Sequence, residues 1–405
     1  MDNEAALPHN NFPVWGFLIA AVFTALVVIY IYRRLFFKTE FPLGVKIIAI
    51  LFPFAGMIGN FLIFGYTMRM SKGSSFSDVP LMFSSTFFSF ILVLFFLLVF
   101  HDLLMFIFMI FRAVLIKIIN WKMDKDKKVH AVNLTPEGRT VKSIVLLSLA
   151  FILFLVGFYQ AVCQSPYIER EIFFSKTNNS KYLKIAHLSD LHLGTFTGKK
   201  WFSKVIRNVN QYDPDLICIT GDFADNRADQ REDVTAMLKQ FKAPVCYVSG
   251  NHEIIWGYQD WIRAVARNRV LVLDGKRTIM NINGKKILVA GIKDIGRNAW
   301  YFKVTGVFKK LLVNAPKVDM KILLSHRPEI LPSASKEGYD LVLAGHTHDG
   351  QSLPFKLFAR LLTPYPKGFY KEGKTILFVS PGAGFVGVPL RLGVPKEITF
   401  FKLYL

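Results

Sequence analysis

Five short motifs in the second half of the chain contain residues that can bind metals or move protons. The motifs are, in chain order, SDLH at 189–192, GD at 221–222, GNH at 250–252, SH at 325–326 and GHTH at 345–348. Each follows a short apolar run that is typical of a buried strand. Ligand sites in α/β sheets form just beyond the carboxyl ends of the strands. We therefore expect the five motifs to meet at one rim and to form a single site.

The motifs supply seven candidate metal ligands, and all of them offer oxygen or nitrogen. The candidates are Asp190, His192, Asp222, Asn251, His326, His346 and His348. Asp190 and His192 are two residues apart, so an extended backbone places both on one face, where they can reach one cation. Asp222 follows a glycine that lets the backbone approach a metal closely, and its carboxylate can bridge two cations. A set without thiolates favours Mn, Fe, Zn, Co or Ni over a structural zinc site.

This ligand set predicts phosphoester chemistry. Two cations about 3.5–4 Å apart can share a water molecule, lower its pKa and hold both the attacking and the leaving oxygen of a phosphoryl group. His252 follows Asn251 but points the other way along the chain, so we expect it outside the metal shell. A histidine there can protonate the leaving oxygen. His187 lies inside the strand that precedes SDLH and is expected to be structural.

The chain divides into two parts with different patterns. Apolar runs that alternate with stretches of helical spacing predict an α/β domain over 164–405. The whole chain is 52% hydrophobic, and the excess lies in 1–163. A helix that crosses a membrane needs about 20 apolar residues, and four runs are long enough: 14–32, 45–66, 83–111 and 143–163. Because these runs are apolar on all sides, they predict an all-α region of four transmembrane helices rather than helices of a soluble core.

The positions of Lys and Arg in the loops predict the orientation of these helices in a cell membrane. Residues 1–13 contain neither, whereas the loop after the third run is rich in both. This alternation places the domain after residue 163 on the non-cytoplasmic side. A break at His101–Asp102 would make the third run re-entrant and reverse the orientation. Charged groups at membrane depth are candidates for function, but we favour a structural role in which both pair with neighbours and end the span.

The overall charge bears on possible partners. A formal net charge of +21 concentrates anionic substrates and favours contact with acidic lipid headgroups. The chain carries no helix-turn-helix, RNA-recognition or zinc-finger signature, which argues against nucleic acid as a partner. Cys163, Cys218 and Cys246 show no paired spacing, so we expect neither a disulfide framework nor a Cys-rich metal site.

The motifs resemble those of the calcineurin-like metallophosphoesterase superfamily. The likeness covers roughly 166–405 and is greatest for the bacterial membrane-anchored branch, with LSDLHLG, GD, GNHE and GHTHDGQ, and with FVSPGAGFVGVPLRLGVPKEI near the end. It implies a four-layer α/β/β/α sandwich. It also implies that metal one takes Asp190, His192, Asp222 and His348, that metal two takes Asp222, Asn251, His326 and His346, and that His252 is the catalytic histidine.

The chain departs from that pattern at three points. Asp349 stands where the usual GHTHGGQ has glycine, and its carboxylate could either orient a ligand histidine or repel phosphate. Lys396 is inserted before Glu397 and is expected to lie on the surface. Four predicted spans exceed the single anchor of the simplest members.

Two segments bear on substrate access. Residues 167–174 are expected to form an edge strand soon after the last span, so the domain must lie close to the bilayer. Residues 353–370 mix Phe, Leu and Tyr with Lys and Arg, which suits either an interfacial segment that reaches headgroups or an ordinary loop over the sheet edge. Trp300, Tyr301 and Phe302 make a weaker case of the same kind.

We therefore expect a membrane-anchored phosphodiesterase or phosphatase with two divalent metal ions, Mn, Fe or Zn, in which a metal-bridging hydroxide attacks and His252 assists the leaving group. Its substrate would be a phosphoester or pyrophosphate of a lipid or an envelope metabolite. The alternatives are a membrane sensor or transporter whose outer domain binds phosphate ligands without turnover, and a tethered scaffold. The oligomeric state is not predicted.

Overall fold

The computed structural model describes residues 14–69, 78–121, 135–163, 166–174, 182–294 and 310–405. It divides into two compact units, one containing most of residues 1–155 and the other most of residues 156–405. Trp300, Tyr301 and Phe302 lie outside the described residues, so the prediction made for them stays a prediction.

The first unit consists of long apolar helices. They are α1 (Val14–Leu35), α2 (Leu43–Arg69), α3 (Asp78–Trp121) and α4 (Pro136–Val162). All four are long and apolar enough to cross a membrane, in agreement with the four predicted spans. Their interfaces are rich in aromatic rings, such as the edge-to-face contact of Phe90 with Phe154 at 5.8 Å.

The pair His101–Asp102 does not break or end its helix, because α3 continues without interruption to Trp121. The helix thus extends past the pair, and the expectation that the pair ends the span stays a prediction. Its other part, pairing with neighbours, is confirmed: Asp102 Oδ2 accepts a hydrogen bond from the Tyr30 hydroxyl at 2.7 Å and lies 2.6 Å from Arg34 Nε. A carboxylate inside an apolar helix is thus neutralised within the helical unit.

The second unit contains two six-stranded sheets. The first has the strand order β1-β12-β2-β3-β4-β5 and the second β10-β11-β9-β8-β7-β6. The strands of the first sheet are β1 (Tyr167–Phe173), β2 (Tyr182–Leu188), β3 (Leu216–Thr220), β4 (Val245–Val248), β5 (Val270–Val272) and β12 (Ile398–Tyr404). Those of the second are β6 (Arg277–Ile282), β7 (Lys285–Ile292), β8 (Met320–Ser325), β9 (Leu341–Ala344), β10 (Gly368–Glu372) and β11 (Thr375–Val379). As predicted, β1 is an edge strand.

Short helices complete this unit. They are α5 (Lys199–Tyr212), α6 (Glu232–Thr235), α7 (Asn251–Ile255), α8 (Tyr258–Ala266), α10 (Leu331–Lys336) and α11 (Phe355–Leu362), with 3-10 turns η2 (Ala228–Gln230), η3 (Ala236–Gln240), η4 (Pro328–Ile330) and η5 (His348–Gly350). In α5 the buried residues are Phe202, Val205, Ile206 and Val209, whose spacing of three and four residues places them on one face against the sheet.

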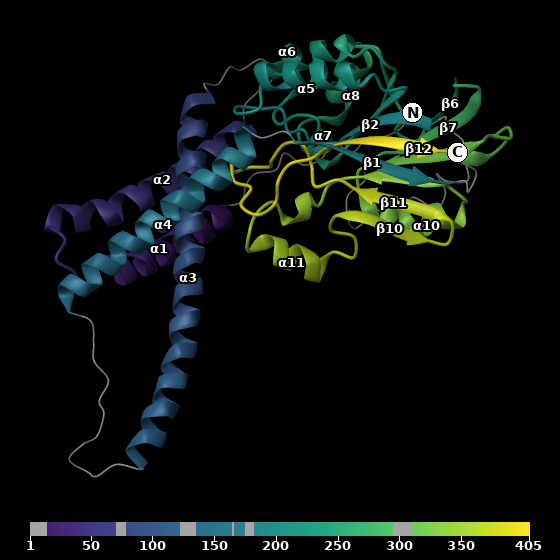
Figure 1. Cartoon of the computed structure of the whole chain (residues 1–405). Helices are drawn as coiled ribbons and strands as arrows, with labels where there is room; N and C mark the ends of the chain where they lie inside the picture. The colour runs from purple at the N-terminus through teal and green to yellow at the C-terminus, as the bar shows by residue number, and fades with distance from the viewer. Residues whose placement is uncertain (1–13, 70–77, 122–134, 164–165, 175–181, 295–309) are drawn as a thin grey trace. The chain divides into compact units, whose positions relative to one another are not determined.

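Three apolar clusters show that the unit has four layers. One packs α5 and α8 against the first sheet, one lies between the two sheets, and one packs α10 against the second sheet. In Figure 1, α5, α6 and α8 lie on one side of the sheets and α10 on the other. The predicted α/β/β/α sandwich after an all-α region is therefore confirmed. Cys218 and Cys246 are buried in strands, as expected.

Candidate metal centre

The five motifs lie at the carboxyl ends of neighbouring strands. In the first sheet β2, β3 and β4 are parallel neighbours, and they end at SDLH, GD and GNH respectively. In the second sheet β8 and β9 are parallel neighbours and end at SH and GHTH. Parallel strands have their carboxyl ends at the same edge of a sheet, so the fold gathers all seven predicted ligands and His252 at one rim.

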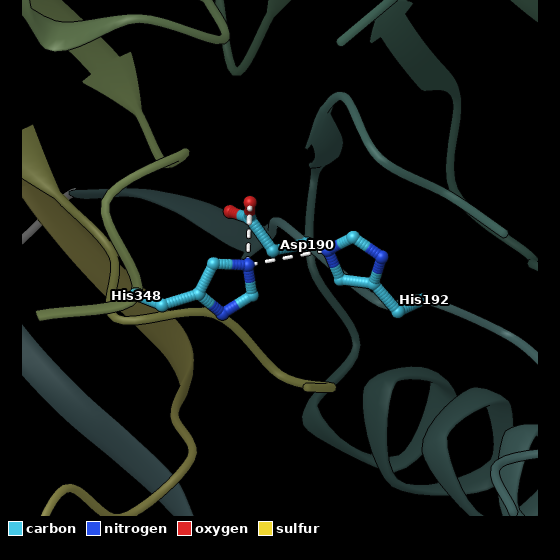
Figure 2. Close-up of side chains that lie close together, drawn as sticks. All are labelled: Asp190, His192 and His348. Carbon is cyan, nitrogen blue, oxygen red and sulfur yellow. Dashed lines mark hydrogen bonds and ion pairs between the residues drawn. The ribbon is translucent and has the colours of Figure 1, made fainter. Parts of the chain in front are cut away.

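One group of ligand atoms comprises Asp190, His192 and His348. Their ligand atoms all lie within 4.8 Å of one another. Nε2 of His348 is 3.2 Å from Nε2 of His192 and 3.3 Å from Oδ1 of Asp190. Figure 2 shows the imidazole of His348 facing both of the other side chains. All three residues are buried.

A second group lies around His326, and Asp222 connects the two groups. Nε2 of His326 is 3.3 Å from Oδ2 of Asp222, 3.1 Å from Oδ1 of Asn251 and 3.2 Å from Nδ1 of His346. The same Oδ2 atom of Asp222 lies 3.7 Å from Nε2 of His192. One carboxylate oxygen thus faces both groups. Burial alone would raise the pKa of Asp222, but the imidazoles of His326 and His252 prevail and hold it well below its usual range.

Two of the histidines are oriented for metal binding by partners behind the ring. Nδ1 of His192 lies 2.9 Å from Oδ1 of Asp225, and Nδ1 of His326 lies 2.8 Å from the carbonyl oxygen of Thr220. A carboxylate and a carbonyl only accept, so each Nδ1 carries a proton, and each Nε2 is the nitrogen that would bind a cation. This donor chemistry fits divalent cations bound by nitrogen and oxygen.

Arginines stand behind the other two histidines. Nη2 of Arg391 is 2.7 Å from Nδ1 of His348, and Nη1 of Arg327 is 2.7 Å from Nε2 of His346. Burial and the charge of Arg391 lower the pKa of His348. Burial, His326 and Arg327 lower the pKa of His346 to about 2. Both rings are therefore neutral at physiological pH, which is the form that binds metal.

His252 belongs to the site through Asp225. Nδ1 of His252 lies 2.8 Å from Oδ1 of Asp225, the same atom that contacts His192. Burial disfavours the charged ring, but the carboxylates of Asp222 and Asp225 prevail and raise the pKa of His252 to about 9. His252, Asn251 and His346 are only partly buried. The side of the site that is open to solvent therefore carries a protonated imidazole.

The backbone approaches the ligands so closely that only glycine fits. A Cβ atom on Gly250 would collide with the carboxylate of Asp222, and one on Gly345 would collide with Ser189 and Asp190. Glu253 of the GNHE motif is buried and accepts hydrogen bonds from the backbone amides of Gly250, Asp222 and Phe223 at 2.7, 3.1 and 2.8 Å. This carboxylate thus fastens two ligand loops to each other.

Several ligands have an uncommon backbone conformation. Asp190, His192, Asp222, His346 and His348 have φ values of 52, 43, 51, 72 and 50 degrees. Such left-handed residues cost about 1–3 kcal/mol each and persist where the surrounding structure holds them. The strand-end turns therefore direct these side chains into the rim at the expense of local stability.

Asp349 and Lys396, two points where the chain departs from the family pattern, are both buried. Asp349 is buried, and its Oδ1 atom lies 3.5 Å from Nε of Arg360. Its φ is 49 degrees, a conformation that Asp tolerates better than most residues that replace glycine. Lys396 is not on the surface: it is 1% exposed, and its Nζ lies 4.9 Å from the ring centroid of Trp201. The expectation for Lys396 is wrong because the segment before β12 turns inward.

Four residues of the site were not identified from the sequence: Asp225, Glu253, Arg327 and Arg391. Asp225 and Glu253 lie within three residues of a predicted ligand, so their acidic character near a motif was a usable signal. Arg327 follows His326 directly. Arg391 lies 43 residues from its partner His348, and nothing local indicates the contact.

Comparison with known proteins identifies the family of this chain. Residues 183–350 match the family model described as calcineurin-like phosphoesterase. An uncharacterized metallophosphoesterase of Campylobacter jejuni is 30% identical over 97% of this chain and 98% of its own length. One of Helicobacter pylori is 32% identical over 61% of this chain and 66% of its own length. A transmembrane protein with metallophosphoesterase domain of Bos taurus is 33% identical over 54% of this chain and 52% of its own length. This chain belongs to the calcineurin-like phosphoesterase family.

Proposed function

We propose that this chain is a membrane-anchored, metal-dependent phosphohydrolase that holds two divalent cations. The observation that carries the proposal is that Asp222 Oδ2 faces His192 of one ligand group at 3.7 Å and His326 of the other at 3.3 Å. Asp190, His192, Asp222 and His348 would hold one cation, and Asp222, Asn251, His326 and His346 the other. The nitrogen and oxygen donors suit Mn, Fe or Zn.

When bound, two such cations supply a nucleophile at neutral pH and stabilise charge on the phosphoryl oxygens. The chain's own residues do the rest. Asp225 accepts a hydrogen bond from His252 Nδ1, which orients the ring and leaves Nε2–H free to donate toward the open side of the site. His252 would give this proton to the leaving oxygen, and the raised pKa keeps the ring protonated.

The substrate class we propose is a phosphoester or pyrophosphate. The formal net charge of +21 favours anionic substrates. We propose a location at the cell membrane, with residues 164–405 as the catalytic domain on the non-cytoplasmic side, from the Lys and Arg of the loops. The unbroken α3 supports a single crossing of the third span. The hypothesis of a sensor or transporter depended on His101 and Asp102. The ion pair of Asp102 with Arg34 favours a structural role for Asp102.

Turnover of bis-p-nitrophenyl phosphate and p-nitrophenyl phosphate by the purified full chain tests this proposal. We expect a chelator to abolish hydrolysis and added Mn to restore it. The variant Asn251→Ala should keep its fold but lose most of the rate. Hydrolysis that survives the chelator, or that is the same in Asn251→Ala, would contradict the proposal.

A further inference from the structure

Helix α11 (Phe355–Leu362) lies seven residues beyond the last metal ligand and has an unusual surface. None of its residues is buried. The most exposed are Leu361 at 81% and Leu362 at 75%. We define the α11 apolar face as the exposed side chains of Leu353, Phe355, Leu357, Phe358, Leu361 and Leu362. An ordinary loop over the sheet edge would bury some of these side chains, and α11 buries none.

Each of the two charged residues of α11 has one partner in the domain. Nζ of Lys356 donates to the carbonyl oxygen of Gly393 at 3.1 Å, and Nε of Arg360 lies 3.5 Å from Asp349 Oδ1. At 3.6 residues per turn, positions 356 and 360 share one side of the helix, and the apolar face occupies the rest. The helix therefore has a narrow basic side and a wide apolar side, and the apolar side is exposed.

The composition around the helix indicates what covers the apolar face. Residues 350–371 contain four basic residues and no Asp or Glu: Lys356, Arg360, Lys367 and Lys371. Apolar side chains flanked by basic ones are typical of helices that lie in the headgroup region of a membrane with anionic lipids. The chain carries its own long apolar helices, and only residues 163–166 separate α4 from β1. A bilayer is therefore within reach of this domain.

We propose that the α11 apolar face inserts into the headgroup boundary of an anionic lipid bilayer. The helix is connected to the metal site through Arg360, whose partner Asp349 at 3.5 Å is the chain neighbour of the proposed ligand His348. Docking of α11 thus places the site beside the lipid headgroups. The substrate class that follows is a phosphoester carried by a membrane-resident molecule, and this consequence rests on the proposed function.

The position of the helix can be measured without any assay of activity. The full chain with Cys163→Ser and Leu361→Cys, labelled with an environment-sensitive nitrobenzoxadiazole dye, is reconstituted into vesicles of phosphatidylcholine and phosphatidylglycerol. Cys218 and Cys246 are buried and stay unlabelled. The matched control is Ile279→Cys on β6, also exposed. We expect blue-shifted emission at position 361 and strong quenching by lipids with a doxyl group near the headgroup, and neither effect at 279.

Three outcomes would overturn the proposal. Emission at 361 equal to that at 279 means that water covers the face. Blue-shifted emission without quenching by doxyl lipid means that another part of a protein covers it. Cross-linking between the cysteines at position 361 of two chains means that a second copy covers it.

A second measurement tests the consequence for substrate. In the variant Leu361→Glu, Leu362→Glu, we expect turnover of bis-p-nitrophenyl phosphate to stay unchanged. Turnover of a long-chain alkyl p-nitrophenyl phosphodiester held in the vesicles should fall by roughly tenfold. Leu361→Ile, Leu362→Ile should behave as the wild type. Equal loss on both substrates, or no loss on either, contradicts the consequence. If the wild type hydrolyses neither ester, the proposed function fails, while the dye measurement still decides the position of α11.

Discussion

The Oδ1 atom of Asp225 lies 2.8 Å from Nδ1 of His252, the proposed proton donor. The same oxygen lies 2.9 Å from Nδ1 of His192, a proposed metal ligand. A single carboxylate therefore orients a ligand and the proton donor together. Burial would raise the pKa of this carboxyl group, but the two imidazoles prevail and hold it well below its usual range.

Asp225→Asn should impair the orientation of His192 and of His252 without unfolding the protein. The neutral amide no longer supports the imidazolium, so the pKa of His252 falls and the alkaline limb of the pH–rate profile moves to lower pH. We expect kcat to drop by about 100-fold and affinity for the metals by about 10- to 100-fold.

The matched control is Asp233→Asn, which removes a surface carboxylate 3.8 Å from Lys199. It should leave both the rate and the pH profile as in the wild type. An Asp225→Asn protein with an unshifted alkaline limb would show that Asp225 does not set the protonation of His252.

Gly250→Ala tests the close approach of the backbone to Asp222. The added Cβ would occupy the place of the Asp222 carboxylate, so either the loop or the ligand must move. We expect a loss of metal affinity of at least about tenfold with only a modest drop in the unfolding temperature. Isothermal titration with Mn measures the affinity. Gly198→Ala, where the added carbon meets only an ordinary contact at 3.7 Å, should bind Mn as the wild type does.

Much of this site could be predicted because its signals are local. Each ligand is adjacent to an apolar run that forms a strand, and the parallel order of β2, β3 and β4 follows from the β-α-β pattern. The contact of Arg391 with His348 could not be predicted, since it depends on how a segment 43 residues away folds back. Local charge was also misleading, because Lys396 is buried although a lysine inserted beside a glutamate indicates a surface position.

His187 should make the protein sensitive to acid. It is buried, and burial lowers its pKa from 6.5 to about 3. Below pH 6.5 the unfolded chain takes up a proton that the folded chain does not, so stability falls as the pH drops toward 3, by about 1.4 kcal/mol per pH unit. Its ring lies against Phe378 and Phe401, so His187→Phe fits the site.

Denaturant unfolding of the full chain in detergent from pH 6.5 to 4.5 measures this effect. His187→Phe should be slightly less stable at neutral pH, because the contact of His187 Nε2 with Thr220 Oγ1 at 2.8 Å is lost. Its stability should then decline less steeply with acid than that of the wild type. If the free energies of unfolding of His187→Phe and of the wild type fall equally steeply with pH, His187 is not a source of acid sensitivity.

Lys396 should destabilise the fold at neutral pH. Burial, with a smaller contribution from Arg391, lowers its pKa from 10.5 to about 7. Between pH 7 and 10.5 the unfolded chain keeps a proton that the folded chain has lost, so the stability of the wild type rises with pH in that window. Lys396→Met removes the charge and keeps the length of the side chain. We expect a higher unfolding temperature at pH 7 and an advantage that shrinks by pH 10. A destabilised variant would mean that the contact with Trp201 outweighs the burial of the charge.

Asp222 is proposed to join two cations in one site, and the metal content of the full chain measures this. After dialysis against Mn, elemental analysis of the wild type should give about two metal ions per chain. Asp222→Asn, which keeps the shape of the side chain but weakens the ligand that faces both groups, should retain fewer than about one. A wild type with one ion or none, or an Asp222→Asn variant with the same metal content as the wild type, would mean that Asp222 does not join two cations.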